Sequence, residues 1–503
     1  MIDGGLFLGR NPSTGLSLEP ENLIRRLNEQ GISTAIVSSY KSLFFDSREG
    51  NDDVLDLAEE FPDRILPAIM MNAFNYDVMA DANYFRDMRQ QGARVFSILL
   101  SPVYYDIHLD SRLLRHMAHE AAKAGLVVQL GIRNPTDFRI ALDFYSDMKA
   151  PVLIRWMTGR NYDYLGEMIL AIKHTDHFYF DVGSLLNPGG IKLLIERGGA
   201  DRLYYCSNQP EALPYSSLAL FEAAKISEGD REKIGHRNLE KIFGLTSTPT
   251  IPLPQAWKNR WKEILKYPKI DTHFHIDGWN LMEPEHDPVF FQEYFDHYGY
   301  EKIVISSIRG LNDDIVRANE ETAKLIASKE GHYGLITLDP NRTELSIQQL
   351  KMHGKNKKFV GLKTIQDAYK LPLNADSYVK IFKANVASFK LPVMAHIPGM
   401  LEAAKQFPKL NFICAHSTWG RVGHFAKQKN IFFDIATSHH DAHETRLDQL
   451  MKAAGEDRIL YACDAQLLHP AWTMGKIASY SFAPATLKKI FQTNAQKAFP
   501  RLK

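Results

Sequence analysis

Three short apolar segments in the second half of the chain each end in a histidine or an aspartate. They are Leu391–His396 (LPVMAH), Leu410–His416 (LNFICAH) and Arg458–Asp464 (RILYACD). Short apolar runs of this kind are typical of strands buried on both faces, as in a parallel sheet. In a closed parallel barrel the carboxyl ends of all strands meet at one mouth, so a polar residue at each strand end can join one site. The pattern therefore favours a parallel α/β barrel with a site at that mouth.

A fourth segment, residues 269–277, contains a His-x-His pair in a β-prone run that reads KIDTHFHID. Alternate side chains of a strand point to the same side, so His273 and His275 direct two imidazoles one way while Phe274 packs the other way. Two convergent imidazoles are half of a metal site. A His-x-His pair also arises by chance, and strand-end histidines can simply bond backbone carbonyls. That structural alternative accounts for one or two histidines, but not for four and an aspartate in this order.

Helix-like stretches alternate with the apolar runs from about residue 299 to residue 503. The spacing of charged and apolar residues predicts amphipathic helices over 313–330, 374–390, 401–407 and 484–498. Further strands are expected over 302–307, 333–338, 359–365 and 431–435. With the four segments above, they make eight strand–helix units in roughly 235 residues, a length that suits one (β/α)8 barrel.

Taken together, these motifs resemble the amidohydrolase superfamily. They are Ile270–His275, Val360–Lys363, Val393–His396, Ile413–Gly420, Tyr461–Asp464 and Asn494–Phe499. Within the superfamily they are similar to the amidohydrolase-2 branch, which includes aminocarboxymuconate semialdehyde decarboxylase, resorcylate decarboxylases and several lactonases. The resemblance implies a catalytic divalent metal, usually zinc, at the barrel mouth.

The resemblance also implies a role for each polar residue. His273, His275 and His396 are the expected nitrogen ligands of the metal. Asp464 is the expected oxygen ligand and the base that takes a proton from metal-bound water. His416 fits either a second metal ion or, as in relatives with one metal, a polarising role toward the attacking water or the substrate carbonyl. We favour the polarising role.

Lys363 ends the expected strand FVGLK, where some members of the superfamily carry a carboxylated lysine that bridges two metals. His396 and His416 could then hold the second ion. In members with one metal, an uncarboxylated lysine at this position faces the substrate or forms an ion pair. We favour one ion, with zinc expected and manganese as the alternative, and we expect Asp464, His416 and Lys363 to be the catalytic residues.

Two further residues are candidates for substrate contact. Arg309 follows the expected strand 302–307, where a guanidinium could bind a substrate carboxylate through two parallel hydrogen bonds. A solvated loop arginine is the alternative. Trp419 lies just past the third histidine segment and could form a wall of the pocket, as could the later cluster His439, His440 and His443. Histidine-rich loops also arise without function, so this cluster stays outside the expected site.

The first half of the chain repeats the opening motif without its ligands. Residues 1–9 (MIDGGLFLG) correspond to residues 269–277 at an offset of 268 (271 − 3). Gly5 and Phe7 then occupy the two histidine positions. Neither a hydrogen atom nor a phenyl ring can bind a metal in place of an imidazole.

The closing motif is repeated in the same way. Residues 201–208 (DRLYYCSN) correspond to residues 457–464 at an offset of 256 (457 − 201), so Asn208 replaces Asp464. With less certain alignment, Gly131 stands at the His396 position, Ser97 at the Lys363 position, and Trp156, or Arg155 after a one-residue slip, at the His416 position. We therefore expect an α/β protein of two tandem (β/α)8 TIM-barrel-like domains, the first of which lacks a catalytic metal.

Many relatives in this branch look like homodimers in which a neighbouring barrel lends an arginine to the active site. A fused first barrel could act as that partner in an intrachain pseudo-dimer and supply Arg155, Arg133 or another basic group. Alternatively, it is a scaffold that covers an apolar flank of the second barrel. A homo-oligomer remains open, and the expected partner is a small-molecule substrate.

The chain has 503 residues, which suits two domains of ordinary size. The expected boundaries are 1–245 for the first barrel, 246–267 for a proline-rich linker and lead-in helix, and 268–503 for the catalytic barrel. A formal net charge of +1 gives no electrostatic reason to expect nucleic-acid binding. No apolar run approaches the ~20 residues of a membrane span, and three cysteines in strand-like runs suit a reducing compartment, so we expect a cytoplasmic protein.

From these features we expect a metal-dependent hydrolase. Metal-bound hydroxide would attack a lactone, ester or amide of a small carboxylate-bearing substrate. The first alternative is non-oxidative, metal-dependent decarboxylation of a small aromatic or unsaturated acid. The second is a non-catalytic two-barrel ligand-binding protein, which a complete set of metal ligands in the second half makes less attractive.

Overall fold

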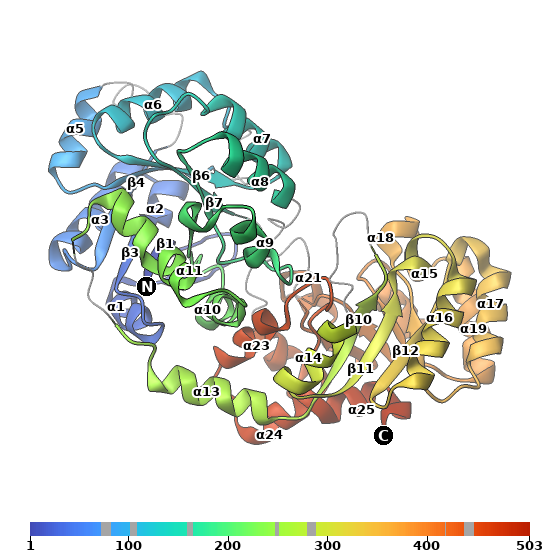
Figure 1. The fold of residues 1–503 in the computed structure, drawn as a ribbon. Coiled ribbons are helices and arrows are strands. Elements are labelled where there is room, and N and C mark those ends of the chain that lie inside the picture. Colours follow the sequence, from blue (N-terminus) through green and yellow to red (C-terminus); the bar gives the residue numbers. More distant parts are fainter. Residues whose placement is uncertain are drawn as a thin grey trace. The chain divides into compact units, whose positions relative to one another are not determined.

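The computed structural model describes residues 1–71, 82–100, 108–157, 164–246, 251–278, 288–417, 419–436 and 447–503. The chain divides into two compact units, with the boundary between Arg260 and Trp261 (Figure 1). This boundary falls inside helix α13 (Gln255–Lys266). Each unit is a TIM-barrel-like domain, so the predicted fold class is confirmed.

Unit 1 is built on a nine-stranded sheet in the order β2-β1-β3-β4-β5-β6-β7-β8-β9. Its strands are β1 (Ile2–Arg10), β2 (Ser17–Leu18), β3 (Thr34–Ser39), β4 (Ile65–Met70), β5 (Val95–Ile98), β6 (Val127–Ile132), β7 (Val152–Trp156), β8 (Phe178–Asp181) and β9 (Leu203–Tyr204). Only β2 is antiparallel to its neighbour among these described strands. The N–H of Gly4 donates to the carbonyl of Tyr205 at 2.8 Å, which joins β1 to the chain just after β9 and closes the barrel.

Helices follow most of these strands in unit 1. They are α1 (Pro20–Glu29), α2 (Tyr40–Phe44), α3 (Ser47–Glu60), α5 (Ala82–Gln90), α6 (Arg112–Lys123), α7 (Pro135–Phe144), α8 (Leu165–His174), α9 (Gly190–Glu196), η2 (Ala200–Arg202), α10 (Pro214–Ala223), α11 (Glu228–Glu232), the π-helical turn η3 (Lys233–Arg237) and α12 (Asn238–Phe243).

Unit 2 contains an eight-stranded parallel sheet in simple chain order. Its strands are β10 (Lys269–Ile276), β11 (Tyr300–Ser307), β12 (His332–Thr337), β13 (Phe359–Lys363), β14 (Val393–Ala395), β15 (Phe412–Cys414), β16 (Ile431–Asp434) and β17 (Ile459–Leu460). A parallel bridge between Phe274 and Ala465 brings the chain after β17 back to β10 and closes the barrel.

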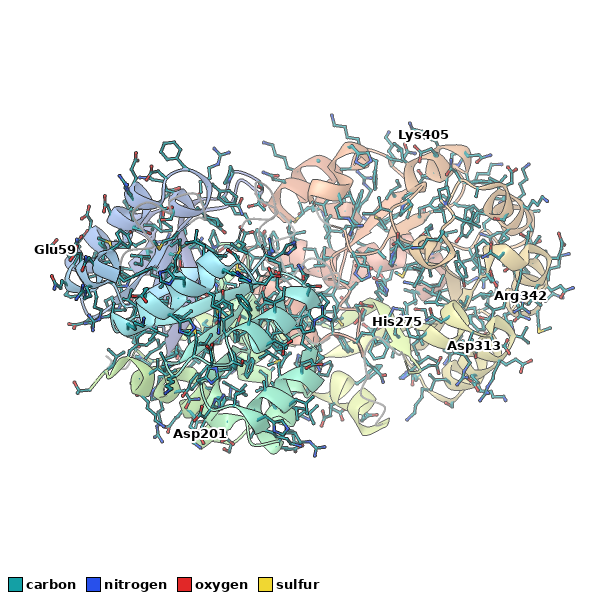
Figure 2. The ribbon with its side chains drawn as sticks, turned by 90° about the horizontal axis from the view of Figure 1, so that it is seen from above. Glu59, Asp201, His275, Asp313, Arg342 and Lys405 are labelled. Carbon is teal, nitrogen blue, oxygen red and sulfur yellow. The ribbon has the colours of Figure 1, made fainter. Side chains whose placement is uncertain are left out.

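The helices of unit 2 lie outside its strands (Figure 1). They are α14 (Pro288–Tyr298), α15 (Ile308–Asn312), α16 (Ile315–Ser328), η4 (Pro340–Arg342), α17 (Thr343–His353), α18 (Gln366–Tyr369), α19 (Asp376–Ser388), α20 (Met400–Gln406), α21 (Trp419–Val422), η5 (Gly423–Phe425), α22 (Leu447–Ala454), η6 (Glu456–Arg458), α23 (Pro470–Ala478), α24 (Pro484–Lys488), the π-helical turn η7 (Lys489–Thr493), α25 (Asn494–Ala498) and η8 (Pro500–Leu502). Figure 2 shows Asp313, Arg342 and Lys405 in this outer layer, and all three are exposed.

Local sequence explains where several of these helices begin. Asp46 precedes α3 and accepts hydrogen bonds from the N–H groups of Arg48 and Glu49. Asp314 precedes α16 and accepts from the second and third residues that follow it in the same way. Such caps satisfy N–H groups that have no partner inside the helix, and each contributes ~1 kcal/mol.

An apolar layer fills the interior of unit 2 below its mouth. Each of the eight strands contributes one buried residue: Ile270, Val304, Leu335, Val360, Met394, Ile413, Phe432 and Leu460. Phe499, just after α25, and Leu502, in η8, pack against this layer. Full burial of one such side chain contributes roughly 1.5–3 kcal/mol. The interior is therefore a packed core, and the predicted site residues lie toward the opposite, carboxyl end of the strands.

The described residues contain no helix that is both long and apolar enough to cross a membrane.

Candidate metal centre

The residues that the sequence predicts as ligands lie at the carboxyl ends of the strands of unit 2. His273 and His275 are on β10, and Lys363 is the last residue of β13. His396 follows β14 directly, and His416 lies two residues beyond β15. Asp464 lies further on, four residues after β17 ends. Because parallel strands in a barrel end at one mouth, residues far apart in the chain can meet there.

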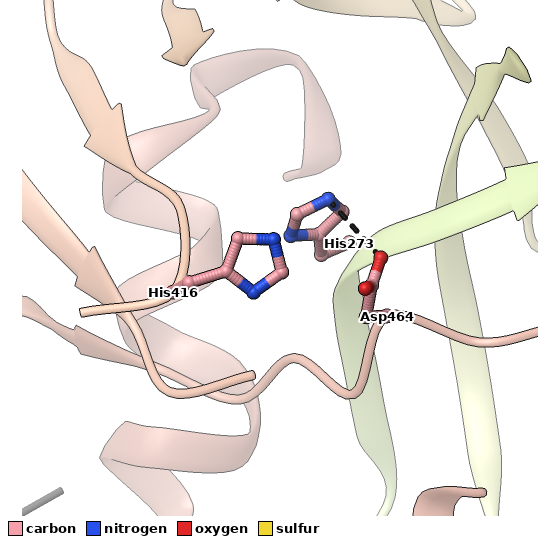
Figure 3. A group of neighbouring side chains, drawn as sticks. All are labelled: His273, His416 and Asp464. Atoms are coloured by element: carbon pink, nitrogen blue, oxygen red, sulfur yellow. Dashed lines mark ion pairs between the residues drawn. The ribbon is translucent and has the colours of Figure 1, made fainter. Parts of the chain in front are cut away.

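Three of these side chains form a compact, buried group (Figure 3). Ligand atoms of His273, His416 and Asp464 all lie within 4.8 Å of one another. The Nε2 atom of His273 is 3.5 Å from Oδ1 of Asp464, and the ring centroids of His273 and His416 are 4.9 Å apart. Two imidazoles and a carboxylate at this spacing could hold a divalent metal ion.

His275 faces the same point. Its Nε2 atom lies 3.1 Å from Oδ1 of Asp464 and 3.1 Å from Nε2 of His273. The two imidazoles of the His-x-His pair thus converge, as expected for alternate residues of a strand. Figure 2 shows where His275 lies in unit 2.

The outer nitrogens of both histidines have partners. Nδ1 of His273 is 2.7 Å from Oδ2 of Asp434, and Nδ1 of His275 is 3.0 Å from Oγ of Ser306. With Nδ1 held in this way, Nε2 of each ring is directed toward the shared centre, which is how ligand histidines are usually oriented.

Asp434 is a site residue that the sequence argument missed. It ends β16, and its Oδ1 also accepts the N–H of Ala436 at 2.8 Å. Burial raises its pKa to about 7. The segment Ile431–Asp434 is an apolar run that ends in a carboxylate, so the signal that singled out Asp464 was present here too.

Lys363 is fully buried beside the histidine pair. Its Nζ atom lies 2.8 Å from Nε2 of His273. Burial lowers its pKa to about 8, although the carboxylates of Asp464 and Asp434 act in the opposite direction. The amino group therefore contacts a candidate ligand directly, and its position suits a group that meets the substrate.

His396 lies at the edge of the group. Its Nδ1 is 2.7 Å from Oδ2 of Asp367, and its backbone N–H donates to Oε1 of Gln366 at 2.8 Å. Its ring centroid is 5.3 Å from that of His416. Of these two histidines, His416 is the one within the compact group, whereas the sequence argument assigned the ligand role to His396. The assignment between them stays a prediction.

The backbone at two of these residues is strained. His416 and Asp464 have φ values of 54° and 59°, in the left-handed region that residues other than glycine rarely adopt. Such a conformation costs of order 1–3 kcal/mol and persists only where the surrounding structure enforces it, most often at functional sites.

Arg309, a predicted substrate contact, is paired with acidic side chains. Arg309 forms ion pairs with Glu321 at 3.3 Å and Asp313 at 3.9 Å. The side chain of Trp419 and the cluster 439–443 lie outside the described residues.

Unit 1 carries different side chains at the matching positions. The register Asp3↔Ala35 between β1 and β3 parallels Asp271↔Ile303 between β10 and β11, which supports the assignment of Gly5 and Phe7 to the histidine positions. Within the described residues, unit 1 holds no cluster of three His, Cys, Asp or Glu side chains at metal-binding distance.

Comparison with known families gives a match for the second half of the chain. Residues 256–501 match the family model described as Amidohydrolase. The match spans unit 2 and includes all the strands that carry the candidate ligands. A comparison with curated proteins found no match.

Several solved structures are similar to about half of the chain. A 2,6-dihydroxybenzoate decarboxylase from Rhizobium is 17% identical, with a TM-score of 0.40 over 47% of this chain and 99% of that protein. A dihydroxybenzoic acid decarboxylase from Polaromonas sp. JS666, solved with manganese and 2-nitroresorcinol, is 18% identical, with a TM-score of 0.39 over 47% and 98%. A putative amidohydrolase from Staphylococcus aureus is 16% identical, with a TM-score of 0.37 over 49% and 100%.

Proposed function

We propose that residues 268–503 form a metal-dependent enzyme of the amidohydrolase type that acts on a small carboxylate-bearing substrate. The observation that carries this proposal is the convergence of His273, His275, His416 and Asp464 on one buried point, inside the segment that matches the Amidohydrolase family. Four buried polar side chains in one place are costly unless they share a ligand or form a satisfied network.

The residues present fit a divalent cation. His273, His275 and Asp464 would hold it, with His416 or His396 completing the set. Asp434 and Ser306 contact the outer nitrogens of the histidine pair, so the inner nitrogens face the shared centre, where Nζ of Lys363 also lies. Nitrogen and oxygen donors of this kind suit zinc, and they suit manganese as well. Zinc remains our first choice, with one ion in the site.

The protein residues themselves have defined tasks in this proposal. A bound divalent metal supplies Lewis-acid chemistry that polarises a carbonyl or carboxylate oxygen of the substrate. Asp464 accepts and returns a proton at its carboxylate oxygens. Lys363 places an ammonium group beside His273, where it can pair with a substrate carboxylate, and His416 faces the same point.

We put non-oxidative decarboxylation of a small aromatic or unsaturated acid first among the reactions. Lys363 is a buried cation in direct contact with a candidate ligand, so it would draw the substrate carboxylate to the reacting centre itself. Arg309, which was expected to bind a substrate carboxylate, is paired with acidic side chains. Hydrolysis of a lactone, ester or amide is the second candidate, because Asp464 can also take a proton from water.

One experiment divides these possibilities. The purified chain is assayed for metal content and then incubated, with added zinc or manganese, with a panel of phenolic acids and a panel of lactones. Release of carbon dioxide from a phenolic acid supports decarboxylation, and release of acid from a lactone supports hydrolysis. A chain that holds no stoichiometric metal and shows no turnover with either added metal would contradict both.

We also propose that the two units arose by duplication. The last elements of each unit correspond at one constant offset: β9 and β17 differ by 256 (459 − 203), η3 and η7 by 256 (489 − 233), and α12 and α25 by 256 (494 − 238). A side-chain contact is repeated at that offset as well. Asn238 donates to the carbonyls of Ala200 and Leu203, as Asn494 does to those of Glu456 and Ile459.

That unit 1 lends a basic group to the second site stays a prediction, and both named arginines have partners inside unit 1. Arg155 is fully buried within unit 1 and donates to Oδ1 of Asn208. Arg133 is paired with Asp137 at 2.7 Å in the same unit.

The three cysteines are free and buried, which suits a reducing compartment, and we propose that the protein is cytoplasmic.

A further inference from the structure

Arg155 of unit 1 contacts three residues that correspond, under the proposed duplication, to candidate ligands of unit 2. Its Nε atom donates to Oδ1 of Asn208 at 2.9 Å, and its guanidinium carbon lies 4.5 Å from the centre of the Phe7 ring. A Cβ atom built on Gly5 would lie only 2.8 Å from that carbon. Asn208, Phe7 and Gly5 stand at the positions of Asp464, His275 and His273. The guanidinium therefore sits where the candidate ligands of unit 2 converge.

The loss of a side chain at residue 5 makes this arrangement possible. A histidine there would collide with the arginine, so the metal ligand and the guanidinium exclude each other. Unit 1 therefore carries the guanidinium of its own arginine where, by this correspondence, unit 2 would bind a metal cation.

Two atoms of this guanidinium lack partners. Nη1 and Nη2 of Arg155 are buried and have no hydrogen-bond partner among the described residues. A buried charged group whose donors are unsatisfied is unfavourable, so such groups are normally paired. The geometry thus leaves two parallel donors in need of an acceptor.

The nearby carboxyl groups are engaged elsewhere. Asp3 accepts hydrogen bonds from the N–H groups of Gly5 and Ser207 and from the Ser207 hydroxyl. Asp181 accepts from the N–H of Gly183 and from Nδ2 of Asn208. Burial raises the pKa of Asp3, and it raises the pKa of Asp181 to about 7.

Aromatic and polar side chains complete the surroundings. Tyr40 stacks on Phe7 with ring centroids 4.3 Å apart and an interplanar angle of 8°. Its hydroxyl donates to Glu211, which also accepts from Asn11. Glu211 is thus a third acidic group here, and it already bonds two donors. The site combines a cation with two free donors and a stacked aromatic pair.

We propose that unit 1 binds the carboxylate of a small organic acid through Nη1 and Nη2 of Arg155. A guanidinium matches a carboxylate with two parallel N–H···O bonds, so this ligand class satisfies both free donors at once. The proposal concerns unit 1 alone and does not depend on the reaction proposed for unit 2.

Benzoate is a suitable probe, titrated into the full chain by isothermal calorimetry. The chain carries His273→Ala, so that binding at a metal in unit 2 does not contribute. Benzamide, which has the same ring without the charge, is the control ligand. We expect saturable binding of benzoate and none of benzamide at the same concentrations. If benzoate does not bind, the proposal is wrong, because the two Nη atoms then do not bind a carboxylate.

Substitution of the arginine locates the binding. We expect Arg155→Gln to weaken benzoate binding at least tenfold and Arg155→Lys, which keeps the charge but not the planar fork, at least fivefold. Arg139→Gln changes an exposed arginine of the same unit and should leave binding unchanged. Circular dichroism checks that each variant is folded. If Arg155→Gln fails to fold, Arg155→Lys alone decides. Equal affinity in a folded Arg155 variant would contradict the proposal.

Discussion

Asp464 combines a strained backbone with close contacts to both histidines of the His-x-His pair. Its φ of 59° turns the chain sharply after β17, and Oδ1 then reaches 3.1 Å from His275 and 3.5 Å from His273. The counterpart Asn208 keeps the same backbone, with a φ of 54°, although it has no carboxylate. Both units thus share the left-handed backbone at this position, whereas only unit 2, with its candidate metal centre, has a carboxylate there.

We expect Asp464→Asn to lower kcat/KM by at least about 1000-fold, because the amide can neither carry the ligand charge nor accept a proton. Asparagine tolerates the left-handed backbone, so the fold should persist. Metal content by mass spectrometry of the metal and initial rates measure the two effects. Asp313→Asn, at an exposed position, is the control. Full activity in Asp464→Asn would refute its role.

Lys269 predicts a pH dependence of stability. It is buried at the start of β10, its ammonium group donates to the carbonyls of Ile264 and Tyr267, and burial lowers its pKa to about 7. Below that pH both the folded and the unfolded chain bind the proton, and the folded state carries the cost of a buried cation. Between pH ~7 and pH ~10 only the unfolded chain keeps the proton, so the free energy of unfolding should rise with pH.

Urea unfolding of the full chain at pH 7, 8 and 9 measures how the free energy of unfolding of unit 2 changes with pH. The contribution of one such group reaches ~1.4 kcal/mol per pH unit. We expect Lys269→Met to flatten the rise and Lys405→Met, at an exposed position, to leave it intact. An unchanged slope in Lys269→Met would show that the lysine keeps an ordinary pKa.

The closing turn of each barrel depends on one buried asparagine. Asn494, at the start of α25, donates to the carbonyls of Glu456 and Ile459 and so ties the last helix to the start of β17. Asn238 makes the matching contacts at the start of α12. Removal of such a side chain leaves one buried and one partly buried carbonyl without this donor, at a cost of about 1–3 kcal/mol.

We therefore expect Asn494→Ala and Asn238→Ala to destabilise their units by similar amounts in chemical unfolding. Asn259→Ala, at an exposed position in α13, should have little effect. A clear loss in one unit with none in the other would argue that the two turns are not equivalent.

Helices and strands of unit 2 lie close to where the sequence predicts them. The expected helix 374–390 is α19 (Asp376–Ser388), and the expected strand 431–435 is β16 (Ile431–Asp434). The observed ends of the ligand-bearing strands differ more from the predicted ends. The expected strand segment 458–464 runs to Asp464, but β17 ends at Leu460, and Asp464 lies beyond the ladder in a left-handed conformation.

The two units should respond differently to metal. The candidate centre lies in unit 2, and the described residues of unit 1 hold no such cluster. A metal at 100 times its Kd stabilises the unit that binds it by about 2.7 kcal/mol. We expect a chelator to lower the midpoint of one calorimetric transition and to leave a second unchanged. His273→Ala should abolish the difference, and a chelator effect on both transitions would count against a metal-free unit 1.

The sequence by itself determined the barrel pattern, the order of the polar strand ends, and the glycine, phenylalanine and asparagine at the matching positions of the first half. These follow from periodicity and residue type, which act over a few neighbouring positions. It did not reveal that Asp434 holds His273, that Asp367 holds His396, or that Arg155 fills the first mouth. Those contacts join residues from 29 to 161 positions apart. Only barrel closure brings such residues together, because strand register and backbone turns decide which side chains meet at the mouth.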